Sequence, residues 1–100
     1  MVWPTAEEAK KMTGKITMVD FENTYSYPTT DWNTCKIFEQ IKRQIVLGDS
    51  SNFTIPISFN NIDSFYVAKS TLNPLGYRVW RTRYYPGYGD YRKDAVEIDY

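Results

Sequence analysis

The sequence contains no histidine and a single cysteine, Cys35. Without histidine, the usual general base and the commonest metal ligand are both missing. A lone cysteine can form neither an internal disulfide nor a thiolate metal site, and it is typical of a reducing cytoplasm. The carboxylates show no ligand spacing of the EF-hand type. We therefore expect no structural metal, no cofactor and no internal covalent cross-link.

The sequence motifs of common enzymes are missing as well. The chain has no Walker A motif, no nucleophile elbow and no dinucleotide-binding glycine motif. The nearest glycine cluster, Gly87-Tyr88-Gly89, lies in an expected hairpin turn. Acidic residues occur throughout the chain, but no pair stands out as a catalytic couple. The sequence predicts a protein that is not an enzyme.

Long hydrophobic runs are also lacking, so we expect neither a membrane-spanning helix nor a secretory leader. The 100 residues are enough for one domain with a modest core. Lysine and arginine together number 12, and aspartate and glutamate also number 12, which gives a formal net charge of zero. A neutral molecule is a poor general ligand for nucleic acid, which disfavours that class of partner.

The clearest helical signal lies between residues 30 and 47. Thr30 or Asp31 is suited to cap this helix. Its apolar stripe consists of Cys35, Ile37, Phe38, Ile41 and Ile45. We expect Cys35 to be a buried small hydrophobe and Trp32 to pack against the preceding connector.

A strand and a second helix follow this first helix. The strand is predicted by the alternation of apolar and polar residues, and its apolar positions are Phe53, Ile55, Ile57 and Phe59. Pro56 places the strand at an edge of its sheet. The second helix is expected between the cap Asn60-Asn61 and the stop Asn73-Pro74, with Ile62, Phe65, Tyr66, Lys69 and Leu72 at helical spacing.

Two further strands are expected, over about residues 77–85 and 91–100, joined by turn residues 86–90. Because Pro56 assigns the first strand to an edge, the C-terminal strand is predicted to lie in the centre of the sheet. The predicted fold class is α+β in the order α-β-α-β-β, with a three-stranded, mainly antiparallel sheet packed on two helices. Two helices cover one sheet face and leave the other to an N-terminal arm, a partner or solvent.

Residues 1–29 are predicted to form an N-terminal arm and connector, separate from an α+β domain of residues 30–100. Pro4 at a first helical position, followed by the capping pair Thr5 and Glu8, predicts a helix over about residues 5–12. Its low apolar content favours a helical arm outside the core.

The connector from Lys15 to Thr30 has a weak pattern. We interpret it as an extended segment, with at most one short strand, that lies on the domain. Trp3, near the start of the arm, either anchors the arm or docks it on another molecule.

The segment from Gly76 to Tyr91 is the richest in binding chemistry. It combines six aromatic residues with three arginines, and Asp90 is its single acid. Aromatic rings beside guanidinium groups are suited to hold flat or anionic ligands. The candidate binding residues are Arg78, Trp80, Arg81, Arg83, Tyr84, Tyr85 and Tyr88.

Two registers of this strand are compatible with its pattern. In the first, Tyr77 and Val79 face the helices. Arg78, Trp80 and Tyr84 then face outward from the open side of the sheet. A shift by one residue would turn Trp80 inward and the next two arginines outward. A purely structural interpretation competes with binding, because the tyrosines are good strand formers and Trp80 would also fit beneath the connector.

The run from Pro4 to Thr13, PTAEEAKKMT, resembles the start of many small, uncharacterised proteins encoded by tailed bacteriophages. The later layout is similar to the same group: an isoleucine-rich helix ending at Gly48, an alternating strand, a second helix, LGYRV at residues 75–79 and a closing strand. The connector and hairpin are more aromatic than is usual in this group. The resemblance implies origin and fold, and it transfers no catalytic or binding residue.

Three functions follow from these observations. The first is a non-enzymatic phage accessory protein of the host cytoplasm, which inhibits or sequesters a host or defence component through the aromatic and arginine surface of the hairpin. The second is a structural component of the virion, such as a head or tail accessory protein. The third is a nucleic-acid-binding accessory protein. The expected ligand is a protein or a small nucleotide-like anion, self-association is compatible with the open sheet face, and no membrane partner is expected.

Overall fold

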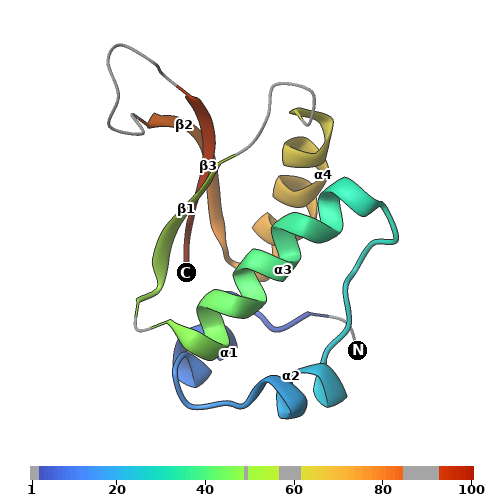
Figure 1. Ribbon diagram of the computed structural model, residues 1–100, viewed down its shortest axis with the longest axis vertical. Coiled ribbons are helices and arrows are strands. Elements are labelled where there is room, and N and C mark those ends of the chain that lie inside the picture. The colour runs from blue at the N-terminus through green and yellow to red at the C-terminus, as the bar shows by residue number, and fades with distance from the viewer. Residues whose placement is uncertain (1–2, 49, 57–61, 85–92) are drawn as a thin grey trace.

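The computed structural model describes residues 3–48, 50–56, 62–84 and 93–100. Its elements are α1 (Ala6–Met12), α2 (Met18–Thr24), α3 (Trp32–Leu47), β1 (Asn52–Pro56), α4 (Ile62–Leu72), the short 3-10 helix η2 (Asn73–Leu75), β2 (Arg78–Tyr84) and β3 (Lys93–Asp99). Figure 1 shows the sheet on one side, α3 and α4 beside it, and α1 and α2 at the far end. The predicted α+β class is confirmed.

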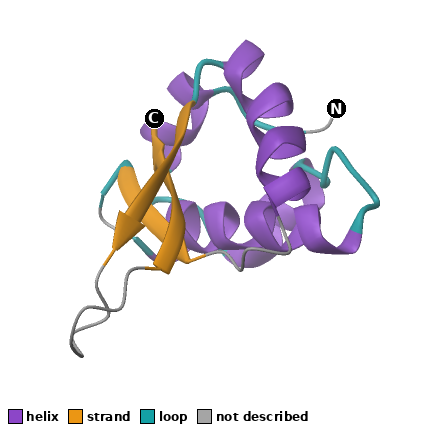
Figure 2. Ribbon diagram, turned by 90° about the horizontal axis from the view of Figure 1, so that it is seen from above, coloured by secondary structure: helices purple, strands orange, loops and turns teal. Residues whose placement is uncertain are grey.

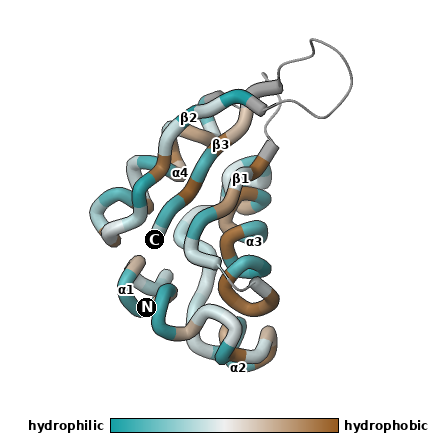
Figure 3. The backbone as a smooth tube through the Cα atoms, turned by 90° about the vertical axis from the view of Figure 1, so that its left-hand side faces the viewer, coloured by the Kyte–Doolittle hydropathy of each residue, from teal (hydrophilic) through white to brown (hydrophobic). Residues whose placement is uncertain are grey.

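The sheet has the strand order β1-β3-β2, and both pairs of strands are antiparallel. The C-terminal strand is therefore central and the strand that contains Pro56 lies at an edge, as predicted. The register sets Val96 opposite Ile55 and Ile98 opposite Val79. Hydrophobic and hydrophilic residues alternate over the last four positions of β3, from Val96 to Asp99, toward the C-terminus in Figure 3. Successive side chains of a strand point to opposite faces, so this alternation separates a buried face from an exposed one.

The core lies between the apolar face of this sheet and the helices. Phe38, Ile41 and Ile45 of α3 have no exposed surface, and Val96 and Ile98 of β3 are also fully buried. In Figure 2 the strands gather at one side of the molecule and the helices fill the rest. The apolar stripe predicted for α3 therefore faces the sheet, as its spacing required.

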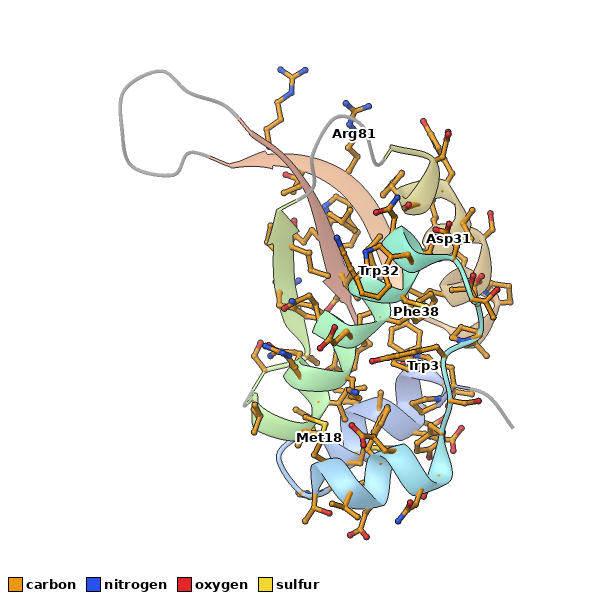
Figure 4. The ribbon with its side chains drawn as sticks, turned by 45° about the vertical axis from the view of Figure 1, so that its right-hand side comes forward. Trp3, Met18, Asp31, Trp32, Phe38 and Arg81 are labelled. Atoms are coloured by element: carbon orange, nitrogen blue, oxygen red, sulfur yellow. The ribbon has the colours of Figure 1, made fainter. Side chains whose placement is uncertain are left out.

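The N-terminal residues belong to this core, which corrects the expectation of a separate helical arm. Trp3 is 4% exposed and Ala9 is fully buried. The ring of Trp3 packs edge-on against Phe38, with 5.1 Å between the ring centroids (Figure 4). The few apolar residues of α1 are enough to bury one side of the helix in the core, because Ala6 and Ala9 lie on that side. The predicted boundary between residues 1–29 and 30–100 stays a prediction. Residues from both ranges contribute to one hydrophobic core.

The capping box predicted for the first helix is present. The Thr5 hydroxyl accepts a hydrogen bond from the Glu8 backbone N–H at 3.2 Å, and the Glu8 carboxylate accepts one from the Thr5 backbone N–H at 3.2 Å. Because Thr5 is the cap, Pro4 precedes it and does not occupy the first helical position that we expected.

A helix, α2, occupies part of the predicted extended connector, so that interpretation is wrong for residues 18–24. The Thr17 hydroxyl caps it by accepting from the Asp20 backbone N–H at 3.1 Å. Phe21 is its one buried residue, and its ring lies 5.4 Å from the Trp3 ring. A single buried position leaves no helical period in the sequence, so this helix depends on its cap and on tertiary packing.

Two expectations for α3 are corrected. Trp32 does not pack on the connector, because its side chain is 74% exposed and the Lys36 ammonium lies 5.5 Å above its ring. Trp32 is two residues from the buried Thr34, which places it roughly 200° around the helix. Cys35 is only partly buried, and its thiol donates a hydrogen bond to the Thr29 carbonyl at 3.2 Å.

Asp31, one of the two predicted caps, is the N-cap residue of α3, and its contribution to stability can be tested through its pH dependence. Its carboxylate accepts from the Thr34 hydroxyl at 2.6 Å and from the Thr34 backbone N–H at 2.9 Å, and these bonds lower the pKa of Asp31 below its ordinary value. A carboxyl group whose pKa is lower in the folded chain than in the unfolded chain stabilises the fold at pH values above its unfolded pKa. This stabilisation is lost as the pH falls through the folded pKa. The difference in melting temperature between the wild type and Asp31→Ala should therefore shrink from about pH 5 to about pH 2. A difference that stays constant over this range would contradict the cap.

The second predicted helix is present as α4, with Phe65 and Leu72 buried. Tyr66, which we placed among its periodic residues, is 55% exposed. Gly76 then takes a φ of 96°, in the left-handed region that favours glycine, and turns the chain from η2 into β2. The predicted cap at residues 60–61 and the strand positions 57 and 59 lie outside the described residues.

Candidate functional site

The outward face of the sheet carries two of the predicted binding residues, Arg78 and Trp80. Tyr77 and Val79 are 2% and 4% exposed and face the helices, whereas Trp80 is 38% exposed. The first of the two predicted registers is therefore confirmed. The exposure of Trp80 also contradicts the alternative in which it packs beneath the connector.

A hydrogen-bond network across the three strands holds Trp80 in place. Its indole Nε1 donates to Glu97 Oε2 at 3.0 Å, and Glu97 lies directly opposite it on β3. The other carboxylate oxygen, Glu97 Oε1, accepts from Asn52 Nδ2 of β1 at 3.3 Å. Because both oxygens of Glu97 are engaged, the indole ring is oriented before any ligand arrives.

The second outward residue, Arg78, forms an ion pair on the same face. Its guanidinium nitrogen lies 2.6 Å from Asp99 Oδ2, and Asp99 is its register partner on β3. The side chain of Arg78 is 77% exposed, and that of Asp99 is 22% exposed. An anionic ligand that approaches Arg78 must therefore compete with a carboxylate already in contact with it.

The structure does not bring all the predicted binding residues together. Arg81 and Arg83 are exposed on the opposite side of β2, because side chains alternate along a strand. Figure 4 shows Arg81 at the end of the molecule remote from Trp3. Tyr84 pairs with Lys93 through its backbone, but its side chain lies outside the description, as do Tyr85 and Tyr88. Their part in binding stays a prediction.

A second site, which the sequence did not reveal, is a groove beside α2 and α3. Its volume is about 340 Å³, and its lining residues are Trp3, Phe21, Glu22, Tyr25, Ser26, Tyr27 and Lys42. We refer to it as the aromatic groove. Trp3 and Tyr27 stack with 6.0 Å between their ring centroids, and the rings of Phe21 and Tyr25 lie 5.0 Å apart. Burial, together with the charge of nearby Glu8, raises the pKa of the Tyr25 phenol.

One cation lies in the wall of the aromatic groove. Lys42 Nζ donates to Glu22 Oε1 at 3.1 Å and lies 5.2 Å from the centroid of the Tyr27 ring. Burial alone would lower the pKa of Lys42, but its interactions with Tyr27 and Glu22 outweigh burial and raise that pKa. The lysine side chain is 13% exposed and the glutamate side chain 54%. The ammonium is therefore held in the wall, whereas the carboxylate extends into solvent.

This groove was not predictable from the sequence pattern, because its walls come from three separate segments. Trp3 precedes α1, residues 21–27 include the end of α2 and the following connector, and Lys42 is on α3. The closest signal was the pair Tyr25 and Tyr27 in a connector that is unusually rich in aromatic residues. Assigning them to a groove required the helix α2, which the sequence pattern did not predict.

Neither a metal-binding cluster nor a membrane-spanning helix is found in the described part of the chain. Within the four described ranges, no three acidic or thiol side chains come together in an arrangement that would hold a metal ion. No helix in the same ranges combines the length and apolar character that a bilayer crossing needs.

The chain matches no protein-family model, and no curated protein or solved structure is significantly similar to it. The resemblance of its first helix and later layout to small phage proteins therefore stays a hypothesis.

Proposed function

We propose that the protein is a non-enzymatic binding protein, and that the outward face of its sheet docks on a partner protein around Trp80. The observation that carries this proposal is the exposed indole, whose N–H is held by Glu97 at 3.0 Å. An aromatic ring that is already oriented loses little conformational entropy on binding, and tryptophan is enriched among the residues that dominate interface energies.

The charges of this face favour a protein over an anionic ligand. Among its described side chains, Arg78 is balanced by Asp99, and the Glu97 carboxylate lies beside Trp80. A phosphate group would meet two carboxylates and one arginine that is already paired. A protein surface with an apolar pocket and hydrogen-bond donors suits the same groups better. We therefore rank a nucleotide-like anion and nucleic acid below a protein partner.

The resemblance to tailed-phage proteins extends this proposal to a biological setting. In that setting the protein inhibits or sequesters a host or defence component in the host cytoplasm. The alternative is a head or tail component of the virion, since an open sheet face is also suited to pack against neighbouring subunits.

Trp80→Ala provides the test of this face. In cells that express the chain, cross-linking and mass spectrometry would identify the partner, and calorimetry would then measure its affinity for purified variants. We expect Trp80→Ala to weaken binding by roughly tenfold or more, as for a central aromatic residue of an interface. The free variant should lose less than about 1.5 kcal/mol of unfolding free energy, because the side chain is partly exposed.

Tyr66→Ala is the matched control, because it removes another exposed aromatic side chain, on α4. This variant should bind as the wild type does. Binding to a protein should also change little as salt is raised, whereas a steep loss of affinity would indicate nucleic acid. A large loss of stability in Trp80→Ala with unchanged affinity would refute the proposal. Recovery of the protein in fixed stoichiometry from purified particles would instead support the virion alternative.

A further inference from the structure

The aromatic groove has the size and walls of a small-molecule site. Its volume of about 340 Å³ lies at the small end of the usual range for such sites, which suits a ligand of one or two fused rings. Tyr25 and Tyr27 supply accessible aromatic surface on its sides, and the buried rings of Trp3 and Phe21 lie behind them. Aromatic walls favour a flat, aromatic ligand, because rings pack well in stacked and edge-on arrangements.

The arrangement of charges in the groove disfavours a cationic ligand. Aromatic clusters with a nearby carboxylate often bind ammonium groups, but here the chain supplies its own. Lys42 Nζ lies over the Tyr27 ring at 5.2 Å and is paired with Glu22 at 3.1 Å. A second cation in this position would be repelled by Lys42.

The ion pair in the wall is built so that one partner can be exchanged. The Glu22 side chain is 54% exposed and can turn into solvent, whereas that of Lys42 is 13% exposed and stays in the wall. An ion pair with an exposed partner contributes little to stability, so losing it costs little. A ligand carboxylate that takes the place of Glu22 would restore the lysine's partner inside a less hydrated site.

We propose that the aromatic groove binds a free planar aromatic monocarboxylate, whose ring lies against Trp3, Tyr25 and Tyr27 and whose carboxylate replaces Glu22 at Lys42. This site is independent of the sheet face around Trp80. If the aromatic groove does not bind the probes, the proposed function of the sheet face is unaffected. If the sheet face does not bind a partner protein, the proposal for the groove is likewise unaffected.

Three probes that share the indole ring test the proposal: indole-3-acetate as the anion, indole as the neutral ring and tryptamine as the cation. The protein has three tryptophans, and Trp3 is the one that lines the groove. In a proton–nitrogen NMR titration, indole-3-acetate should move the indole N–H signal of Trp3 and leave those of Trp32 and Trp80 in place. Its affinity should exceed that of indole by roughly tenfold, because a hydrogen bond to a charged group is stronger than a neutral one. Tryptamine should bind more weakly than indole.

Two variants separate the charge effect from damage to the fold. Lys42→Met keeps the apolar stem and removes the ammonium, so indole-3-acetate and indole should then bind about equally. Glu22→Gln removes the competing carboxylate from an exposed position, so it should tighten binding of indole-3-acetate several-fold and leave that of indole unchanged. Because Glu22 is exposed, this second variant decides the question even if Lys42→Met does not fold.

Several results would overturn the proposal. These are a Trp3 signal that does not move at millimolar probe, stronger binding of tryptamine than of indole-3-acetate, and unchanged affinities in Glu22→Gln. Tighter binding of a tryptophan-containing peptide than of indole-3-acetate would reject a free small molecule in favour of a peptide side chain.

Discussion

Replacing Trp3 by alanine should lower the free energy of unfolding by about 3–5 kcal/mol, as for other buried tryptophans. The side chain is 4% exposed and contacts the rings of Phe21, Tyr27 and Phe38. Its removal would leave a cavity at the junction of the N-terminal segment, the connector and α3. Chemical denaturation followed by circular dichroism would measure the change.

Trp32→Ala is the matched control for this measurement, because it makes the same chemical change at a side chain that is 74% exposed. We expect it to alter the unfolding free energy by less than about 0.5 kcal/mol. Similar effects of the two substitutions would show that the N-terminal segment is a detachable arm and that the packing of Trp3 is wrong.

Ile55→Ala should cost about 2–5 kcal/mol of unfolding free energy. Ile55 is 8% exposed, lies opposite Val96 in the register of β1 and β3, and faces the helices. Its neighbour Thr54 points to the exposed side of the same strand. Thr54→Ala should therefore cost less than about 1 kcal/mol. Urea unfolding of the two variants beside the wild type would measure both values.

The contrast between these neighbours tests the face assignment of β1 directly. Equal losses at Ile55 and Thr54 would show that the edge strand is rotated or shifted by one residue. A loss confined to Thr54 would show that the two faces of β1 are assigned the wrong way round, which would place Asn52 on the opposite side of the sheet from Glu97.

The parts of the fold that were predictable from sequence depend on local periodicity. The alternation around Ile55 and the edge position implied by Pro56 were enough to place the C-terminal strand in the centre of the sheet. The helix α2 and the burial of the N-terminal segment were not predictable in this way. They depend on the contact of Phe21 with Trp3, which are separated in sequence and carry no shared period.

The candidate site was predictable in composition but not in arrangement. Alternation grouped Arg78 with Trp80, yet it allowed two registers, and the burial of Val79 opposite Ile98 selects one of them. The ion pair of Arg78 with Asp99 also makes Arg78 a weaker binding site for anions than its sequence context suggested, because its charge is already paired. Composition alone could not show which carboxylate would lie opposite which base.

The central position of β3 has a consequence for synthesis of the chain on the ribosome. Each of β1 and β2 pairs with β3, so no ladder of this sheet can form before residues 93–99 have emerged. The stretch from Pro56 to Lys93 takes roughly 2–7 seconds to translate at about 5–20 residues per second. During that interval the backbone of β1 has no strand partner, and the bond of Thr13 with Tyr100 has still to form. The nascent chain therefore keeps the edge of β1 unpaired until residues 93–99 have emerged, and the short length of β1 and Pro56 limit the pairing of that edge with other chains.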